Sequence, residues 1–279
     1  MRQEYDIANP RQCSVARMQA SLDAADWHRN LEFIEGVKAE IRAHPVASNP
    51  MIGLLNRGAF GLQALQQIHL EYRHAIVQTF TDALLVAQLE TRQLEPRLKP
   101  GSKMAARTLL TLNCLDEFGF QKPSSAGYRA DPICAHYPLY EQVMEDLKIT
   151  PQMRRDYVPS DIAQATRGAL EKSFGSLVEV AALLAVAEQE VVLYSPPLRL
   201  AVKALGVDVS RGYYHVHGAS TDDSANACDD DHEDDLWFVL AQALQPQEYE
   251  HIRSLCLAYC DTWNEFWNYQ AERELRNAG

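Results

Sequence analysis

The middle of the chain contains an apolar run that is interrupted by two glutamates, Leu183-Leu184-Ala185-Val186-Ala187-Glu188-Gln189-Glu190-Val191-Val192. On a helix, Glu188 shares one face with Leu177, Ala181 and Leu184, which precede it at spacings of three and four. That face is expected to be buried, and a lone buried carboxylate must be paired, protonated or metal-bound because its desolvation is costly. Glu190 lies on a neighbouring stripe, and for this pair of glutamates a metal ligand and a salt bridge remain equally open.

Helical periodicity extends outward from this run in both directions. Prolines and glycines separate the periodic segments, and no alternating strand pattern of useful length is present. Pro196-Pro197 is predicted to end the central helix, and residues 119–132 are predicted to form a loop. Helices are predicted over residues 23–41, 51–55, 61–90, 102–118, 138–147, 160–194, 198–205 and 236–244, and from residue 246 onward.

This pattern predicts an all-α fold. Hydrophobic residues make up 47% of the 279, which is enough to bury a sizeable core. No fixed-period repeat and no shift in composition marks a domain boundary. We therefore expect one helical bundle of seven to nine helices in a single domain over residues 1–279, with residues 1–20 as a loose N-terminal segment.

Charge and composition exclude several classes of function. The formal net charge is −12, which disfavours binding to nucleic acid or to an anionic membrane surface. No apolar run is long enough to cross a bilayer, and the N-terminus lacks the apolar core of a signal peptide, so a cytoplasmic location is expected. The six cysteines form no CxxC pair and are expected to be free thiols. The expected partner is a small-molecule substrate, and a homodimer remains possible.

Two Glu-x-x-His pairs lie on predicted helices. Glu71 and His74 occupy one face of the helix at 61–90, and Glu248 and His251 lie at the start of the last helix. Such pairs form half of a ferritin-type metal motif, so a ferritin-like diiron protein is one alternative. Glu248 follows Pro246 closely, however, and acidic residues are common in an exposed first turn because they complement the helix dipole.

The densest group of potential ligands lies between residues 213 and 235. His215, His217 and His232 are surrounded there by many aspartates, and Asp229-x-x-His232 would place two donors on one helical face. For most of these carboxylates a solvated acidic turn is the simpler interpretation. Three histidines beside this many aspartates would nevertheless suit iron or manganese. Motifs for a serine hydrolase, a phosphate loop, a dinucleotide fold or a Cys-rich zinc site are absent.

In this order the motifs resemble those of the haem-oxygenase-like dimetal oxidase and oxygenase family, which is related in fold to pyrroloquinoline-quinone synthase and thiaminase II. The resemblance covers about residues 44–267. Glu188 matches the glutamate of the family's central helix. The other matching elements are His44-Pro45, Asn113-x-x-Asp116-Glu117-x-Gly119, Ala135-His136-x-Pro138-Leu139, Tyr213-Tyr214-x-x-His217 and Asp229-x-x-His232.

The resemblance implies a haem-oxygenase-like helical bundle that binds Fe(II), two ions per chain, and uses O2 as co-substrate. It implies metal ligands at Glu117, His136, Glu188, His217, Asp229 and His232, with Glu71 as an additional ligand that some members use. The chain departs from the family because His217 and Asp229 are twelve positions apart and because residues 121–131 form an insertion. Asp222 or Asp223 could therefore replace Asp229, His215 could replace His217, or the site could hold a single metal.

The resemblance also implies a class of reaction. Members perform N-oxygenation, oxidative decarboxylation, desaturation or C–C cleavage, often in natural-product biosynthesis. We expect an amino acid or an amino-acid-derived metabolite as substrate, with Arg73, Arg129 or Arg211 as candidates to bind its carboxylate. Two alternatives remain: a cofactor-free enzyme that resembles thiaminase II or the quinone synthase, and a non-enzymatic helical binding protein whose acidic stretch is an interaction surface.

Overall fold

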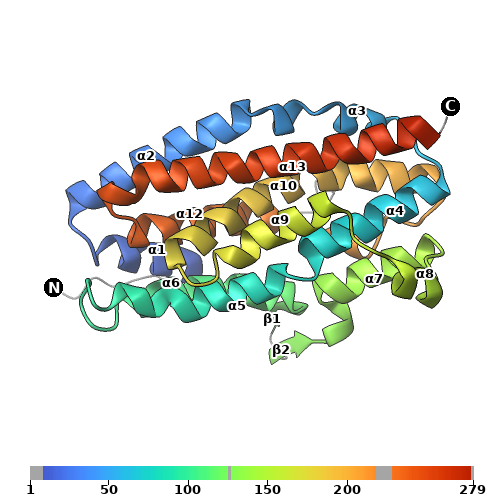
Figure 1. Ribbon diagram of the computed structural model, residues 1–279. Coiled ribbons are helices and arrows are strands. Elements are labelled where there is room, and N and C mark those ends of the chain that lie inside the picture. Colours follow the sequence, from blue (N-terminus) through green and yellow to red (C-terminus); the bar gives the residue numbers. More distant parts are fainter. Residues whose placement is uncertain (1–8, 125–126, 218–227, 278–279) are drawn as a thin grey trace.

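The computed structural model describes residues 9–124, 127–217 and 228–277, and Figure 1 shows them as an elongated bundle of helices. Short 3-10 turns and one π-helical turn, η2 (Arg73–Val77), connect some of the helices. The α-helices are α1 (Pro10–Gln19), α2 (Ala24–Ala43), α3 (Pro50–Asn56), α4 (Leu62–Tyr72), α5 (Phe80–Glu90), α6 (Lys103–Glu117), α7 (His136–Asp146), α8 (Pro151–Asp156), α9 (Asp161–Lys172), α10 (Leu177–Ala204), α11 (Tyr213–Val216), α12 (Cys228–Ala243) and α13 (Tyr249–Asn277).

Helix α10 is the centre of the bundle. Every residue from Val180 to Val191 is buried, because α3, α5, α12 and α13 pack around this helix. A helix that is apolar on all sides is expected in such a central position. One hydrophobic cluster runs through the described residues and includes the aromatic side chains of α13 that face α10. The predicted all-α class is confirmed.

The central helix does not end at Pro196-Pro197, and that prediction is wrong. Both prolines lie inside α10, which continues to Ala204. A proline removes one backbone hydrogen bond and bends a helix, but it does not have to end it. Tyr194, Leu198 and Ala201 are buried on either side of the prolines, so packing holds the helix together across the interruption.

The predicted helix over residues 61–90 is divided in two by the π-helical turn η2. A π turn contains one more residue per hydrogen-bonded loop than an α turn, and it often occurs at functional sites. Here it lies between α4 and α5. This division, together with the short helices α1, α8 and α11 that were not predicted, explains why the described residues form more helical segments than the seven to nine predicted.

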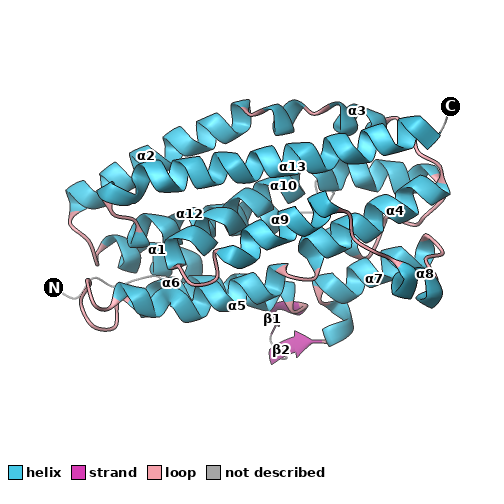
Figure 2. Cartoon of the chain, viewed as in Figure 1, coloured by secondary structure: helices cyan, strands magenta, loops and turns pink. Residues whose placement is uncertain are grey.

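Two segments predicted to lack regular structure form elements. Residues 10–19 form α1, which packs against α6, and Arg11 of α1 contacts both Asp116 and Asp235. The predicted loop at 119–132 contains an antiparallel hairpin of β1 (Phe120–Ser124) and β2 (Gly127–Ala130), in which Phe120 pairs with Ala130. Figure 2 shows strands only in this hairpin, within the ranges drawn in colour.

None of the helices in the described ranges combines the length and the apolar character that spanning a lipid bilayer requires. The long helices instead bury one another. Figure 1 shows α13 running alongside α2, and the two helices contact each other.

Asn30 is expected to be a main point of attachment between α2 and the α12–α13 junction. Its Nδ2 donates to the carbonyl oxygens of Ala241 (2.8 Å) and Leu244 (3.0 Å), and its Oδ1 accepts from the Tyr249 hydroxyl (2.5 Å). Asn30→Leu leaves these buried groups without partners and should lower the free energy of unfolding by about 1–3 kcal/mol in urea titrations. Glu35→Ala, on the exposed side of the same helix, should change it little, and equal stability of the two variants would contradict this role.

Candidate functional site

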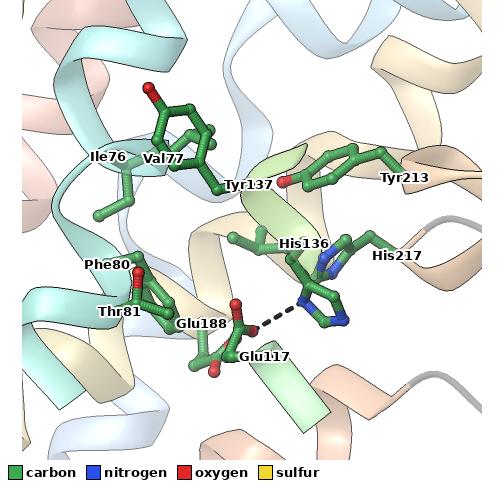
Figure 3. Close-up of a pocket in the computed structure, with 11 residues that line it drawn as sticks. Ile76, Val77, Phe80, Thr81, Glu117, His136, Tyr137, Glu188, Tyr213 and His217 are labelled. Carbon is green, nitrogen blue, oxygen red and sulfur yellow. Dashed lines mark ion pairs between the residues drawn. The ribbon is translucent and has the colours of Figure 1, made fainter. Parts of the chain in front are cut away.

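Four of the predicted ligands line one pocket. Glu117 ends α6, His136 begins α7, Glu188 lies in α10, and His217 follows α11. Each residue is at most 7% exposed. Glu117 Oε1 lies 2.8 Å from His136 Nδ1, and the rings of His136 and His217 have centroids 4.4 Å apart. Figure 3 shows these side chains converging from separate elements, with the Glu117–His136 ion pair dashed.

The backbone between Glu117 and His136 explains how these two side chains meet. After α6 the chain turns at Gly119, whose φ of +76° favours glycine, and the β1–β2 hairpin then returns the chain to α7. A Cβ on Gly119 would lie 2.5 Å from the carbonyl carbon of Cys134 and 2.7 Å from the nitrogen of Ala135. The turn and the segment before His136 are therefore in direct contact.

The remaining wall of the pocket is largely apolar. It contains side chains that were not predicted to line the site: Ile76, Val77, Phe80, Thr81, Tyr137 and Val191. The π-helical turn supplies two adjacent residues of this wall, Ile76 and Val77. The periodicity of the sequence gives no signal for a π turn, so the turn itself could not be predicted.

The other predicted ligands of the acidic segment are only partly described. Asp229 and His232 lie in the first turns of α12, but their side chains are outside the described residues, as are Asp222 and Asp223 entirely. Helix α12 packs against α10, and its Asp235 contacts Arg11, which also bonds Asp116 beside Glu117. The part of α12 around Asp235 therefore lies near the end of α6.

His215 does not take the place of His217. His215 is exposed on α11, whereas His217 is 6% exposed and lines the pocket. The two residues are two positions apart, so the short helix directs them to different sides.

Glu71 is not brought to this pocket, which corrects the expectation that it joins the other ligands. Its Oε2 accepts from the backbone nitrogen (3.2 Å) and the hydroxyl (2.7 Å) of Ser160, and its Oε1 accepts from Gln67 (3.1 Å). Arg273 lies 3.6 Å from the same carboxylate. The buried carboxylate of Glu71 is thus stabilised by hydrogen bonds and an ion pair, without a metal ion.

The ferritin-like alternative is also wrong. His251 is exposed and pairs with Glu179 (2.7 Å), while Glu248 accepts from the backbone nitrogen of Gln245 in a capping box. Arg273, the partner of Glu71, is twenty-two positions from His251 on the same helix, which at 1.5 Å per residue is about 33 Å. The two Glu-x-x-His pairs therefore cannot bind one metal centre.

Glu190 lies on the side of α10 away from the pocket. Its carboxyl accepts from the Tyr72 hydroxyl (3.1 Å) and from Trp267 Nε1 (2.9 Å). Burial raises the pKa of Glu190 to about 8 because it disfavours the charged form. The two hydrogen bonds stabilise the charged form and so lower the pKa, but by less than burial raises it. Of the two glutamates in the central run, only Glu188 faces the candidate site.

The three arginines proposed to bind a carboxylate do not line the pocket. Arg73 pairs with Glu141 and donates to the Tyr137 hydroxyl (2.8 Å), so it lies one side chain behind the wall. Arg211 is exposed and pairs with Asp208 (3.2 Å), and Arg129 is exposed on β2.

A buried tyrosine–histidine pair lies beyond Tyr213, which is also a lining residue. His69 of α4 accepts through Nε2 from the Tyr214 hydroxyl (2.7 Å), and its Nδ1 donates to the Leu65 carbonyl oxygen (2.6 Å). Burial lowers the pKa of His69 to about 4 because the charged ring would lose its hydration. His69 is therefore neutral near pH 7.

The pocket supplies two carboxylates and two imidazoles, a donor set that suits iron or manganese. Among the residues that the structure describes, however, no three His, Cys, Asp or Glu side chains are arranged closely enough to enclose one ion. Glu117 and His136 instead contact each other directly. Binding of a metal would therefore require a rearrangement of these side chains or donors from beyond the described ranges.

Comparison with known proteins supports the architecture. No family model matches the sequence, and no curated protein matches it. A solved TenA homolog from Pseudomonas syringae pv. tomato is similar in structure, with a TM-score of 0.60 and 13% identity over 88% of this chain and 93% of that one. A CADD-like protein of unknown function from Nostoc punctiforme aligns with a TM-score of 0.57 and 14% identity over 88% and 99%. The chain has the all-α haem-oxygenase-like fold. At these identities the likeness shows the fold alone.

The tight approach at Gly119 predicts a strong effect of adding one methyl group. Gly119→Ala should lower the free energy of unfolding by about 1–3 kcal/mol, because alanine is strained at this φ and its Cβ meets backbone rather than a flexible side chain. Gly36→Ala, in an open position inside α2, should leave stability unchanged or raise it by up to about 1 kcal/mol. Urea titrations that show no loss for Gly119→Ala would contradict the described turn.

Neutral burial of His69 predicts a pH-dependent stability. Between about pH 6.5 and pH 4 the unfolded chain binds a proton at His69 that the folded chain does not bind. The contribution of His69 to stability is therefore present above this window and is lost as the pH falls, by up to about 1.4 kcal/mol per pH unit. His69→Gln should show a shallower loss of unfolding free energy over the same window, and parallel pH profiles would contradict the neutral state.

Proposed function

We propose that the chain is an iron- and O2-dependent oxidase or oxygenase that acts on a small molecule. The observation that carries this proposal is the burial of Glu117, His136, Glu188 and His217, from four separate elements, around one pocket. Burying several ionisable groups together is unfavourable unless opposite charge compensates them. Oxygen and imidazole donors suit Fe(II), and they leave positions free for O2 and substrate when the shell is incomplete.

In this proposal the two carboxylates and two imidazoles hold the metal, and Asp229 and His232 of α12 supply further ligands for a second Fe(II). The packing of α12 against α6, with Asp235 and Asp116 bound to the same arginine, supports this assignment. Iron, when bound, would supply the reduction of O2 that is coupled to oxidation of the substrate. The surrounding helices exclude bulk water from the pocket, since each of the four donors is at most 7% exposed.

The lining residues support a substrate that has both an apolar part and a polar group. Ile76, Val77 and Phe80 would contact the apolar part, and the hydroxyls of Thr81 and Tyr137 would orient the polar group. Arg73 donates to the Tyr137 hydroxyl and so favours an anionic group at that hydroxyl. An amino acid or a compound derived from one has both features, and its oxidation in natural-product biosynthesis is the reaction that we propose.

A second candidate is a metal-free enzyme that resembles thiaminase II. It is favoured by the likeness to the TenA homolog and by the direct contact of Glu117 with His136, which could act as an acid–base pair. The residues that line the pocket include no cysteine, so a thiol nucleophile is not available among them. A catalytic role for the pair would have to rely on proton transfer alone.

Iron binding separates the two candidates. Anaerobic titration of the metal-free protein with Fe(II) should show stoichiometric binding that Glu188→Gln weakens at least tenfold, because the variant lacks a charged ligand. Glu190→Gln is the matched control, since Glu190 is buried two positions away on the same helix but faces Tyr72 and Trp267. It should bind iron as the wild type does. If neither variant alters binding, or the wild type binds no iron, the metal proposal fails and turnover without metal becomes the test of the second candidate.

A further inference from the structure

A second cavity, of about 530 Å³, lies at one end of the bundle. Its walls come from α4, from α8 and the connector to α9, and from the C-terminal half of α13, and Figure 1 shows these elements at the end of the molecule where the C-terminus lies. None of the described residues lines both this cavity and the candidate pocket. The volume is within the range of sites that bind small molecules.

One face of α4 forms the floor of this cavity. The residues of this face occupy positions i, i+3, i+4, i+7 and i+8 of the helix, and they are Gln63, Gln66, Gln67, Leu70 and Glu71. A helix face that packs on other elements is ordinarily apolar, but four of these five side chains are polar. The apolar side chains of α4 are buried in the core instead. The floor is therefore suited to a polar ligand.

Glu71 and Arg273 give the cavity an enclosed anion and an accessible cation. Their side chains are 2% and 18% exposed, respectively, and lie 3.6 Å apart. The carboxylate of Glu71 is already surrounded by the donors of Ser160 and Gln67, so the guanidinium is the charge that the cavity presents to a ligand. Its central carbon lies 5.7 Å from the centre of the Tyr269 ring. A guanidinium held between a carboxylate and an aromatic ring is well placed to bind a second carboxylate.

Two glutamine amides add acceptors beside this cation. Gln66 Nε2 donates to the Leu147 carbonyl oxygen (2.8 Å), and Gln67 Nε2 donates to Glu71 Oε1 (3.1 Å). Each amide is fixed through its nitrogen and keeps its oxygen as an acceptor for a ligand. Gln67 and Arg273 are neighbours, because both contact the same oxygen atom of Glu71. The cavity thus sets amide oxygens next to a guanidinium, an arrangement that complements an ammonium group next to a carboxylate.

We infer that this cavity binds a small zwitterion of the amino-acid type. Its carboxylate binds Arg273, and its ammonium group donates to the amide oxygens of Gln66 and Gln67. Its side chain packs on the apolar part of the lining, which consists of Leu70, Met153 and Val158. Val158 is 78% exposed, and covering it removes apolar surface from water. The inference does not rest on the proposed function, since no metal and no residue of the candidate pocket takes part.

Isothermal titration calorimetry with three related probes tests this site. L-Leucine carries both charged groups, L-leucinamide lacks the carboxylate, and 4-methylpentanoate lacks the amine. The wild type should bind L-leucine at least about tenfold more tightly than either analogue, because each analogue loses hydrogen bonds that involve a charged group. Absence of L-leucine binding at millimolar concentrations, or equal affinity for all three probes, would overturn the inference.

Three variants locate the binding. Arg273→Met removes the guanidinium and should weaken L-leucine binding at least about tenfold. Gln66→Leu should also weaken it, and this variant keeps the Glu71–Arg273 ion pair, so it tests the site even if Arg273→Met does not fold. Arg253→Met is the matched control, because Arg253 lies on the same helix and pairs with Glu40 (2.6 Å) but does not line the cavity. It should bind L-leucine as the wild type does.

Circular dichroism of each variant reports whether the helices are intact. If folded Arg273→Met and Gln66→Leu both bind L-leucine with the affinity of the wild type, the amino acid occupies another place and the inference is wrong. Equal weakening in Arg253→Met would contradict it as well, because the effect would then not depend on the residues of the cavity.

Discussion

The cost of burying ionisable side chains in a helical interior governs this structure. Helix α10 is surrounded on all sides, so Glu188 and Glu190 are both removed from water although they point in different directions. Glu190 is stabilised by hydrogen bonds from Tyr72 and Trp267. Glu188 instead faces a pocket that contains another carboxylate and two imidazoles. One helix therefore presents a structural carboxyl group on one side and a potential ligand on the other.

Irregular backbone gives the pocket its composition. The positive φ at Gly119 and the hairpin that follows bring His136 back to Glu117, and the π-helical turn directs Ile76 and Val77 into the same space. The regular helices supply a rigid support around these features. A bundle of this kind can hold a reactive site in an apolar interior because its core is formed independently of the site.

Periodicity was enough to predict the helical class and the burial of Glu188, because both follow from the spacing of apolar residues along one segment. The spacing of Glu71 and His74 placed both on one helical face but gave no information on which cavity Glu71 faces, because that depends on its contacts with Ser160 and Arg273, which are distant in the sequence. The prediction that Pro196-Pro197 ends the central helix was wrong for a related reason, because the packing that keeps α10 helical across the prolines comes from other elements. The π turn left no periodic signal. The ligand assignments at Asp229 and His232 stay predictions.

The most direct measurement of the central claim is the position of iron in the protein. Crystals of the iron-loaded protein, measured on both sides of the iron absorption edge, should give anomalous density between the side chains of Glu117, His136, Glu188 and His217. Density at another place, for example beside Glu71 or on the exterior near His251, would contradict the claim. So would the absence of density in crystals whose solution sample bound iron stoichiometrically.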